Sequence, residues 1–276
     1  MQADFERRGI ETARLDADLL VACALGVKRI TLFLDPDRPL IEAELTKVRA
    51  LVERRRAREP IAYILGEREF YGRSFVVTRD VLIPRPDTET LVDGALTFLR
   101  AAETVEGEVV DLCTGSGAVA ITLAAECKER TVVATDVSAA ALTIARQNAE
   151  RLAVAERLTF CEGDLFEALE PAQRFACITI NPPYIGAHEL ATLEADVRDF
   201  EPHLALDAGA DALSFYRRIA RTAGQHLLPR GALMVEVGFD QAADVCALFV
   251  EAGFDQVRAL RDLGGIDRVV AAVQVS

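Results

Sequence analysis

The feature that most constrains the fold is a regular alternation, after residue 107, of short apolar segments with amphipathic ones. Seven segments rich in apolar and β-branched residues are expected to be strands: Val109–Cys113, Thr131–Thr135, Leu158–Cys161, Ala176–Ile180, Ala232–Val237, Gln256–Leu260 and Asp267–Val273. Five segments are expected to be helices: Gly117–Cys127, Ala139–Leu152, Leu190–Asp199, Leu213–Leu227 and Asp240–Ala252. Such alternation indicates an α/β fold with a mainly parallel sheet and helices on both faces. The last two strands adjoin without a helix, so the final strand is expected to run antiparallel.

The first 60 residues have a different pattern, with apolar residues at helical spacing and no strand-like alternation. A helix is expected from a cap at Thr12 to Gly26, and a second one over residues 41–58. The run Arg54, Arg55, Arg56 and Arg58 is interpreted as a solvated helix face. The alternative is a docking surface for an acidic or phosphate-bearing partner. The region is therefore predicted to be a small helical bundle.

A change of character marks the junction between the two regions. Aromatic and β-branched residues around Tyr71-Gly72 predict a hairpin over residues 69–78. Ile83-Pro84-Arg85-Pro86 forces extended backbone, and Asp87 or Thr88 is positioned to cap the helix that follows. We predict a helical domain over residues 1–80, a hairpin linker at about 68–86 and an α/β domain over 87–276.

Charge and cysteine content narrow the functional classes. The formal net charge is -13, and all of the excess negative charge lies in residues 91–276, which would repel nucleic acid. No apolar run is long enough to span a bilayer and no signal segment follows Met1, so a cytoplasmic protein is expected. The six cysteines contain no C-x-x-C pair, so we expect free buried thiols and no metal site.

A glycine-rich turn follows the first strand of the α/β region. Gly115, Gly117 and Ala120 form G-x-G-x-x-A within the loop Cys113, Thr114, Gly115, Ser116, Gly117. Glycines at a strand-to-helix turn permit a tight bend and close approach of a ligand to the backbone. The second strand leads to Asp136, where a carboxylate can accept both hydroxyls of a ribose. The alternative is a structural turn, with Asp136 or Ser138 capping the next helix.

Two cofactor classes share this pattern, NAD(P) and S-adenosylmethionine. A dinucleotide needs a helix N-terminus for its pyrophosphate. The sulfonium of S-adenosylmethionine is cationic and suits the acidic surroundings, including Asp111 near the end of the first strand. Asp164 and Leu165 follow the third strand and are expected beside an adenine ring. The charges favour S-adenosylmethionine.

The fourth strand delivers Asn181-Pro182-Pro183-Tyr184 to the same edge of the sheet. An amide or nucleobase nitrogen is a poor nucleophile because its lone pair is delocalised. The Asn181 side-chain oxygen and a nearby main-chain carbonyl can accept both N–H bonds and stabilise positive charge developing on the nitrogen. The prolines stiffen these acceptors, and Tyr184 can stack on the planar substrate. The alternative is a Pro-Pro turn with a surface tyrosine.

These motifs resemble those of a known family, the peptide chain release factor glutamine methyltransferases. The resemblance rests on Asn181-Pro182-Pro183-Tyr184-Ile185 after the glycine-rich site and on stretches along the rest of the chain. The further stretches are Arg58-Glu59-Pro60, Tyr63-Ile64-Leu65-Gly66, Phe70-Tyr71-Gly72 and Ile83-Pro84-Arg85-Pro86-Asp87-Thr88-Glu89. Two positions depart from the family pattern, because Cys113 and Ala212 stand where glycine is common.

The resemblance implies an enzyme that transfers methyl from S-adenosyl-L-methionine to the glutamine of a Gly-Gly-Gln motif in release factors, a protein methylation linked to translation termination. It implies a seven-stranded Rossmann-like class I methyltransferase sheet, preceded by a helical bundle that helps to hold the release factor. The implied cofactor-binding residues are Cys113, Thr114, Gly115, Ser116, Gly117, Asp136, Leu165 and Asn181. The implied catalytic residues are Asn181, Pro182 and Tyr184, and Pro183 joins them in substrate binding.

Other functions remain open at this point. A methyltransferase for a ribosomal-protein glutamine shares the catalytic motif. A nucleic-acid amino methyltransferase would hold adenine or guanine in the same site, although the acidic domain and the lack of a basic aromatic face argue against it. An adaptor without activity and an NAD-dependent dehydrogenase both leave the Asn-Pro-Pro-Tyr segment unexplained.

Overall fold

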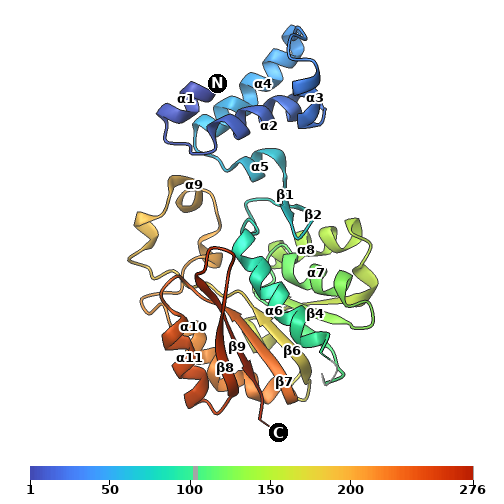
Figure 1. Ribbon diagram of the computed structural model, residues 1–276, viewed down its shortest axis with the longest axis vertical. Coiled ribbons are helices and arrows are strands. Elements are labelled where there is room, and N and C mark those ends of the chain that lie inside the picture. The colour runs from blue at the N-terminus through green and yellow to red at the C-terminus, as the bar shows by residue number, and fades with distance from the viewer. Residues whose placement is uncertain (102–104, 276) are drawn as a thin grey trace. The chain divides into compact units, whose positions relative to one another are not determined.

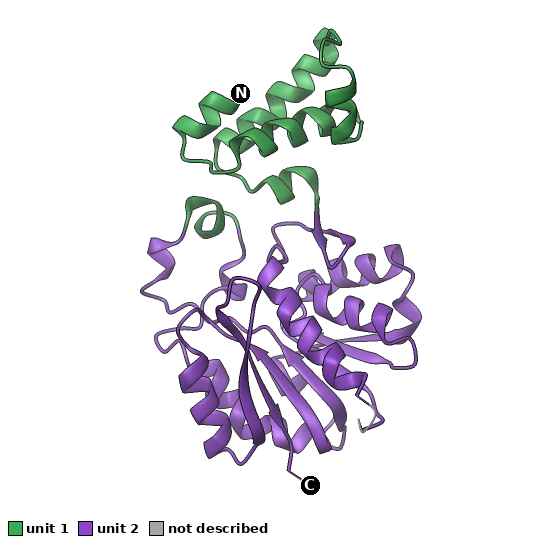
Figure 2. Cartoon of the chain, viewed as in Figure 1, with its two compact units in different colours: residues 1–67, 194–200 green, residues 68–193, 201–276 purple. Residues whose placement is uncertain are grey.

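The computed structural model describes residues 1–101 and 105–275, which divide into two compact units. Unit 1 comprises residues 1–67 and 194–200, and unit 2 comprises residues 68–193 and 201–276 (Figure 2). The chain therefore leaves unit 2 after Leu193, contributes a short segment to unit 1 and returns at Glu201. Within the described residues, no helix is long and apolar enough to cross a membrane.

Unit 2 is built on a seven-stranded sheet of order β5-β4-β3-β6-β7-β9-β8 (Figure 1). The strands are β3 (Val109–Leu112), β4 (Val132–Asp136), β5 (Leu158–Glu162), β6 (Phe175–Ile180), β7 (Leu227–Glu236), β8 (Asp255–Arg261) and β9 (Asp267–Val273). The strands β3 to β7 pair in parallel, whereas β9 runs antiparallel to both β7 and β8. The predicted seven strands and the antiparallel final strand are thus confirmed.

Helices pack on both faces of this sheet and bury two apolar clusters. One cluster joins α6 (Glu89–Leu99) and α7 (Ala118–Glu126) to the sheet, and the other joins α10 (Ser214–Thr222) and α11 (Ala242–Glu251) to its opposite face. The helix α8 (Ala139–Arg151) follows β4. The short 3-10 helices are η1 (Pro86–Thr88), η2 (Ala155–Arg157), η3 (Leu165–Ala168), η4 (Leu190–Thr192), η5 (His203–Ala205) and η6 (Ala223–His226). The expected hairpin is also present, as β1 (Glu67–Phe70) and β2 (Arg73–Val76).

The strand order reverses at β3, because the chain proceeds from β3 to β4 on one side and places β6 on the other. Ligands of open α/β sheets bind at such a switch point, outside the carboxyl ends of the strands. Here the carboxyl ends of β3, β4 and β6 lead directly into Cys113, Val137 and Asn181. The topology therefore brings the glycine-rich turn and the Asn-Pro-Pro-Tyr segment to one edge.

Unit 1 is helical, as predicted. Its helices are α1 (Gln2–Arg7), α2 (Ala13–Leu25), α3 (Arg29–Leu34), α4 (Glu42–Arg56), α5 (Ile61–Leu65) and, from the returning segment, α9 (Ala195–Arg198). Thr12 stands at the N-cap of α2 without a side-chain hydrogen bond, and Gly26 ends the helix in the left-handed conformation. Phe5, Leu20 and Val52 belong to the buried apolar cluster of the unit.

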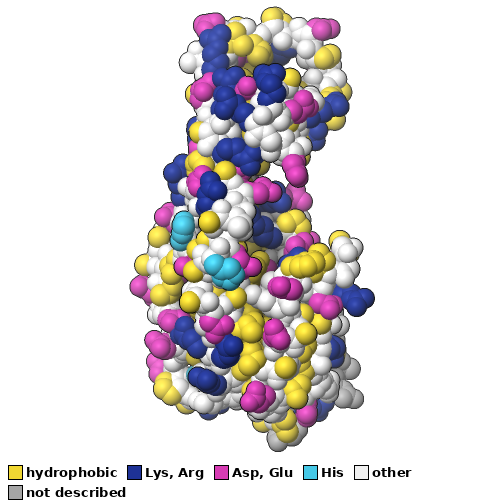
Figure 3. Space-filling view, turned by 90° about the vertical axis from the view of Figure 1, so that its left-hand side faces the viewer, with side chains coloured by type: hydrophobic (Ala, Val, Ile, Leu, Met, Phe, Trp, Pro, Cys, Tyr) yellow, Lys and Arg dark blue, Asp and Glu magenta, His cyan; other side chains and the backbone are white. Residues whose placement is uncertain are grey.

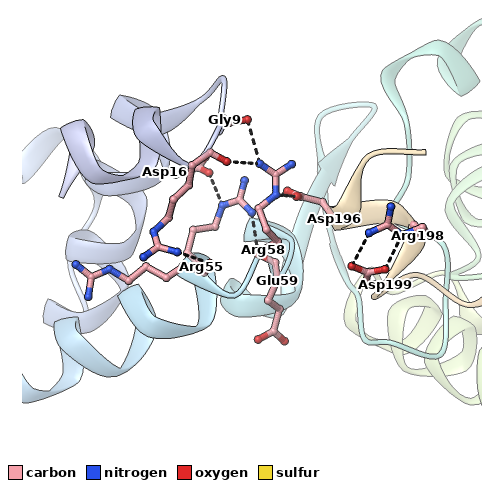
Figure 4. A network of polar contacts seen from close by, with 10 residues as sticks. Gly9, Asp16, Arg55, Arg58, Glu59, Asp196, Arg198 and Asp199 are labelled. Atoms are coloured by element: carbon pink, nitrogen blue, oxygen red, sulfur yellow. Dashed lines mark hydrogen bonds and ion pairs between the residues drawn. The ribbon is translucent and has the colours of Figure 1, made fainter. Parts of the chain in front are cut away.

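The interpretation of the arginine run as a solvated face is wrong for Arg55. Its guanidinium is only 5% exposed and pairs with the Asp16 and Asp196 carboxylates, each at 2.7 Å (Figure 4). Arg58 also pairs with Asp196 and donates to the carbonyl of Gly9 at 3.0 Å. The reason is that α4 turns this arginine toward α2, where burial of a charge requires opposite charges close by.

Two further expectations are wrong. The predicted helix Leu190–Asp199 is broken, because the backbone is extended at Leu193 and Glu194 between η4 and α9, and the ion pairs of Asp196 hold α9 in unit 1. All six cysteines are free, but of these only Cys127 and Cys177 are buried, and Cys23 lies on the exposed side of α2.

Candidate active site

A pocket of about 250 Å³ opens in unit 2 at the carboxyl edge of the sheet. Eight of the predicted site residues line it: Cys113, Thr114, Gly115, Ser116, Asp136, Leu165, Asn181 and Pro183. Gly117, Pro182 and Tyr184 are not among the lining residues that the structure describes. A larger hollow of about 550 Å³ lies along α6 and β8, and no predicted site residue lines it.

The glycine-rich turn uses its glycines in two different ways. Gly115 and Gly117 both have positive φ, at 55° and 81°. A Cβ on Gly115 would meet no atom within 4 Å, so this part of the turn is open to a ligand. A Cβ on Gly117 would lie 2.7 Å from Ile121 and 3.2 Å from Ala145, so this glycine permits α7 and α8 to pack closely. Cys113 also has positive φ, at 58°, a conformation that explains why glycine is common at this position.

Asp136 connects the turn to the end of β4. Its Oδ2 accepts the Gly115 N–H at 2.8 Å, and its Oδ1 accepts the Ser138 N–H at 2.9 Å. Ser138 caps α8 through a hydrogen bond from the Ala141 N–H at 3.2 Å. Burial raises the pKa of Asp136, although these backbone donors oppose the effect. Since Ser138 caps the helix, the lone pairs that remain on Asp136 are available to a ligand.

A second carboxyl group, Asp111, is buried beneath the turn. It accepts hydrogen bonds from the hydroxyls of Thr114 at 2.7 Å and Thr179 at 2.8 Å. Burial raises the pKa of Asp111 to about 7, and the two hydroxyls lower it in part. Asp111 lines the pocket, where a bound cation would favour its ionised form.

Asn181 directly follows β6 and forms part of the pocket wall. Its Nδ2 donates to the Thr88 hydroxyl at 3.4 Å. Pro182 and Pro183 restrict the backbone after it. The structure thus places Asn181 and Pro183 in the same pocket as the glycine-rich turn.

Tyr184 lies at the other end of the motif. Its ring packs against the apolar cluster of α10 and α11, and its carbonyl accepts a hydrogen bond from Gln241 Nε2 at 2.9 Å. Burial raises the pKa of Tyr184 to about 12, so its phenol is neutral at physiological pH.

Sequence reasoning missed several residues that surround this motif. Thr88 was considered only as a helix cap, but its hydroxyl accepts a hydrogen bond from Asn181. Glu201 is buried, accepts the Ile83 N–H at 3.1 Å and pairs with Arg85 at 2.5 Å, which holds the segment before α6 along the pocket. Glu236 ends β7, and the signal that could have identified it is an acidic residue directly after the buried apolar residues 232–235.

Comparisons with known proteins find relatives that cover most of the chain. Residues 1–66 match the family model of the PrmC N-terminal domain, and residues 89–199 match that of the methyltransferase small domain. A release factor glutamine methyltransferase of Geobacter sulfurreducens is 46% identical over 263 residues, which cover 95% of this chain and 90% of that protein. One of Cereibacter sphaeroides is also 46% identical, over 96% of this chain and 92% of that protein. A solved methyltransferase from Pyrococcus furiosus has a similar fold, with a TM-score of 0.54 and 16% identity over 83% of this chain and 98% of that chain.

Proposed function

The chain belongs to the release factor glutamine methyltransferase family, and on that premise we propose that it methylates the glutamine side chain in the Gly-Gly-Gln motif of peptide chain release factors, with S-adenosyl-L-methionine as methyl donor. The observation that carries the proposal is the position of Asn181, which forms part of a pocket wall together with the glycine-rich turn and Asp136. A methyl acceptor held by Asn181 and a donor held by the turn would then meet in one cavity.

The residues of the pocket fit the proposed donor. S-adenosylmethionine supplies an electrophilic methyl group on a positively charged sulfur. Asp136 is suited to the ribose hydroxyls, and the buried Leu165 side chain offers an apolar surface to the adenine. Asp111 supplies negative charge that complements the sulfonium. The main chain of Cys113, Thr114, Gly115, Ser116 and Gly117 would contact the remainder of the molecule.

Asn181 is suited to the proposed acceptor. Its Nδ2 is directed to Thr88, so its Oδ1 is the atom that remains for an N–H of the substrate glutamine. The carbonyl of Pro182 would take the second N–H. The glutamine nitrogen would bond to the methyl carbon as the carbon–sulfur bond of the donor breaks, and it would afterwards lose a proton to water. Both acceptors stabilise the positive charge that develops on the nitrogen.

We assign docking of the release factor to the predicted helical domain, residues 1–80. The match of residues 1–66 to the N-terminal domain of the family supports this role. Every residue of α3 is at least partly exposed, including Ile30, Phe33 and Leu34. On the face shown in Figure 3, Lys and Arg side chains gather over the helical unit. Because release factors act at the ribosome, the proposal places the enzyme in the cytoplasm.

Incubation with labelled S-adenosylmethionine tests the proposal. An intact release factor should be labelled, and one in which alanine replaces the glutamine of the Gly-Gly-Gln motif should not. Ribosomal proteins and nucleic acids serve as competing substrates, and labelling of these alone would refute the assignment. Docking is tested by Phe33→Ser, which should raise KM for the whole release factor but not for a short peptide that carries Gly-Gly-Gln.

A further inference from the structure

Glu236 is a buried acidic residue at the edge of the candidate site. It is the last residue of β7, which pairs in parallel with β6, and Ile180 lies opposite Val235 in the register. Asn181 directly follows Ile180, and Glu236 directly follows Val235. Both side chains therefore start from the same edge of the sheet. Glu236 is 1% exposed, and its Oε2 has no hydrogen-bond partner among the residues that the structure describes.

The contacts of Glu236 lead to the catalytic motif. Thr88 and Asn181 act as donors that lower the pKa of the Glu236 carboxyl, and the Thr88 hydroxyl accepts the Asn181 Nδ2–H at 3.4 Å. An amide nitrogen has two N–H groups. Thr88 and Glu236 together occupy the nitrogen side of the Asn181 amide, which leaves the oxygen side for a substrate.

The segment that follows Glu236 holds the other end of the motif. Gln241 Nε2 donates to the Tyr184 carbonyl at 2.9 Å. Its Oε1 accepts from the Gly238 N–H at 2.9 Å and from the Tyr216 hydroxyl at 2.9 Å. Residues 236–241 therefore contact the Asn-Pro-Pro-Tyr segment at both its first and its last residue.

We propose that Glu236 is a positioning residue for methyl transfer: its carboxylate and the Thr88 hydroxyl fix the Asn181 amide so that Oδ1 faces the substrate glutamine. This inference rests on the proposed function. A carboxylate behind the amide also polarises it, which increases the negative partial charge on Oδ1 where the substrate nitrogen becomes positive. Glu236 acts through Asn181 and does not itself contact the reacting atoms.

The charges around Glu236 make this arrangement sensitive to pH. Burial raises the pKa of Glu236 to about 7; the hydrogen bonds from Thr88 and Asn181 and the positive charge of Arg268 on β9 lower it, and Asp87 raises it. Arg268 is itself paired with Asp87 at 3.1 Å. Tyr184 and Tyr216 face the same region as neutral phenols, and the Tyr216 hydroxyl shares its one hydrogen between Gln241 and the more distant Glu236 carbonyl, at 3.3 Å. Glu236 is the carboxyl of this group whose pKa Asn181 lowers, so its ionisation is coupled to the Asn181 amide.

The test compares wild type with Glu236→Gln, using an intact release factor and labelled S-adenosylmethionine. Loss of a hydrogen bond to a charged group predicts a fall in kcat of about 10–100-fold, with KM and cofactor affinity nearly unchanged. The kcat of wild type should rise with pH through about 7, and this rise should be smaller in the variant, in which Asp111 still titrates in the same range. The matched control is Glu126→Gln, which removes a carboxylate paired with Arg73 and Arg100 at the C-terminal end of α7 and should retain the wild-type pH profile.

Thr88→Val provides a second test that retains the buried carboxylate. It removes the hydroxyl that lowers the pKa of Glu236, so the midpoint of the kcat profile should move to higher pH and kcat should fall. This variant decides the question if Glu236→Gln does not fold. Unchanged kcat and an unchanged pH profile in the folded variants would overturn the positioning role. Absence of label from release factor with wild-type enzyme would instead overturn the proposed function.

Discussion

The buried charges around Arg55 in unit 1 and those at the candidate site in unit 2 are stabilised in different ways. In unit 1, the Arg55 guanidinium lies between the carboxylates of Asp16 and Asp196, so positive and negative charges are buried together. In unit 2, Asp111 and Glu236 are buried with neutral hydroxyl or amide groups as their hydrogen-bond partners, and their pKa values are raised to about 7. Removing one partner of a buried ion pair destabilises the fold. Buried carboxyl groups whose hydrogen-bond partners are neutral have raised pKa values, and such values are common at functional sites.

The largest expected effect concerns the paired charges of unit 1. Arg55→Ala leaves two buried or half-buried carboxylates without their shared partner and should lower the free energy of unfolding by about 3–5 kcal/mol. The measurement is urea unfolding. The control is Arg56→Ala on the same helix, whose exposed ion pairs with Asp4 and Glu53 are screened by solvent and should contribute little to stability. Equal losses of stability in the two variants would show that burial does not make the ion pairs of Arg55 more important than those of Arg56.

The next effect concerns the site of unit 2. Asn181→Ala removes one preorganised acceptor of the substrate N–H and should lower kcat by about 10²–10³-fold. Asn181→Asp keeps the shape but adds a charge that attracts the sulfonium in the ground state, so turnover should fall even where cofactor binding persists. Single-turnover methyl transfer to an intact release factor measures both. If the folded Asn181→Ala variant, saturated with both substrates, keeps near-normal turnover, the Asn-Pro-Pro-Tyr segment is a turn without a catalytic role.

The raised pKa values of unit 2 predict how stability depends on pH. The ordinary pKa values of Asp111 and Glu236 are 3.8 and 4.5, and burial raises both to about 7 in the folded chain. Between these limits the unfolded chain has released the two protons and the folded chain still binds them. The contribution of these groups to the free energy of unfolding is therefore largest below about pH 4, and it is lost as the pH rises through about 7.

Thermal unfolding between pH 4 and pH 8 measures this slope. A tenfold difference in proton affinity between the folded and the unfolded chain corresponds to about 1.4 kcal/mol. Asp111→Asn should flatten part of the decline, since an amide at this position does not ionise and can still bond with Thr114 and Thr179. A decline that is as steep in the variant as in wild type would assign the pH dependence to other groups.

The order of elements in unit 2 could be predicted from the sequence because each strand is an apolar segment between helical ones. Local patterns also identified the hairpin at Tyr71-Gly72 and eight of the residues that line the pocket. The segment 190–199 could not be predicted, because its helical propensity is overridden by ion pairs to residues about 140 positions away, such as Arg55 with Asp196. The same holds for Arg55 itself, since no local pattern distinguishes it from Arg54 and Arg56.

The candidate site shows the same division between local and long-range information. Asn181, Asp136 and the glycine-rich turn were found because each belongs to a short motif at the end of a strand. Glu236 and Gln241 were not found, because their importance comes from the register of β7 against β6 and from the contact with Tyr184. A residue that positions another one has no motif of its own.

The smallest expected effect separates the ligand contact of Asp136 from its structural contacts. Asp136→Ala removes the proposed ribose acceptor and should weaken S-adenosylmethionine binding by about 1.5–3 kcal/mol, the contribution of a hydrogen bond to a charged group. The same change also removes the acceptor of the Gly115 and Ser138 N–H groups. These two hydrogen bonds are the structural contacts of Asp136. Ser138→Ala provides the matched control, because it removes the α8 cap and should cost about 1 kcal/mol of stability. Ser138 also lines the pocket, but its loss should change cofactor affinity much less than the loss of the Asp136 carboxylate. Calorimetric titration of both folded variants distinguishes the two roles. Unchanged affinity in Asp136→Ala, or an equal loss in Ser138→Ala, would mean that Asp136 only shapes the turn and that the donor is held by other residues of the pocket.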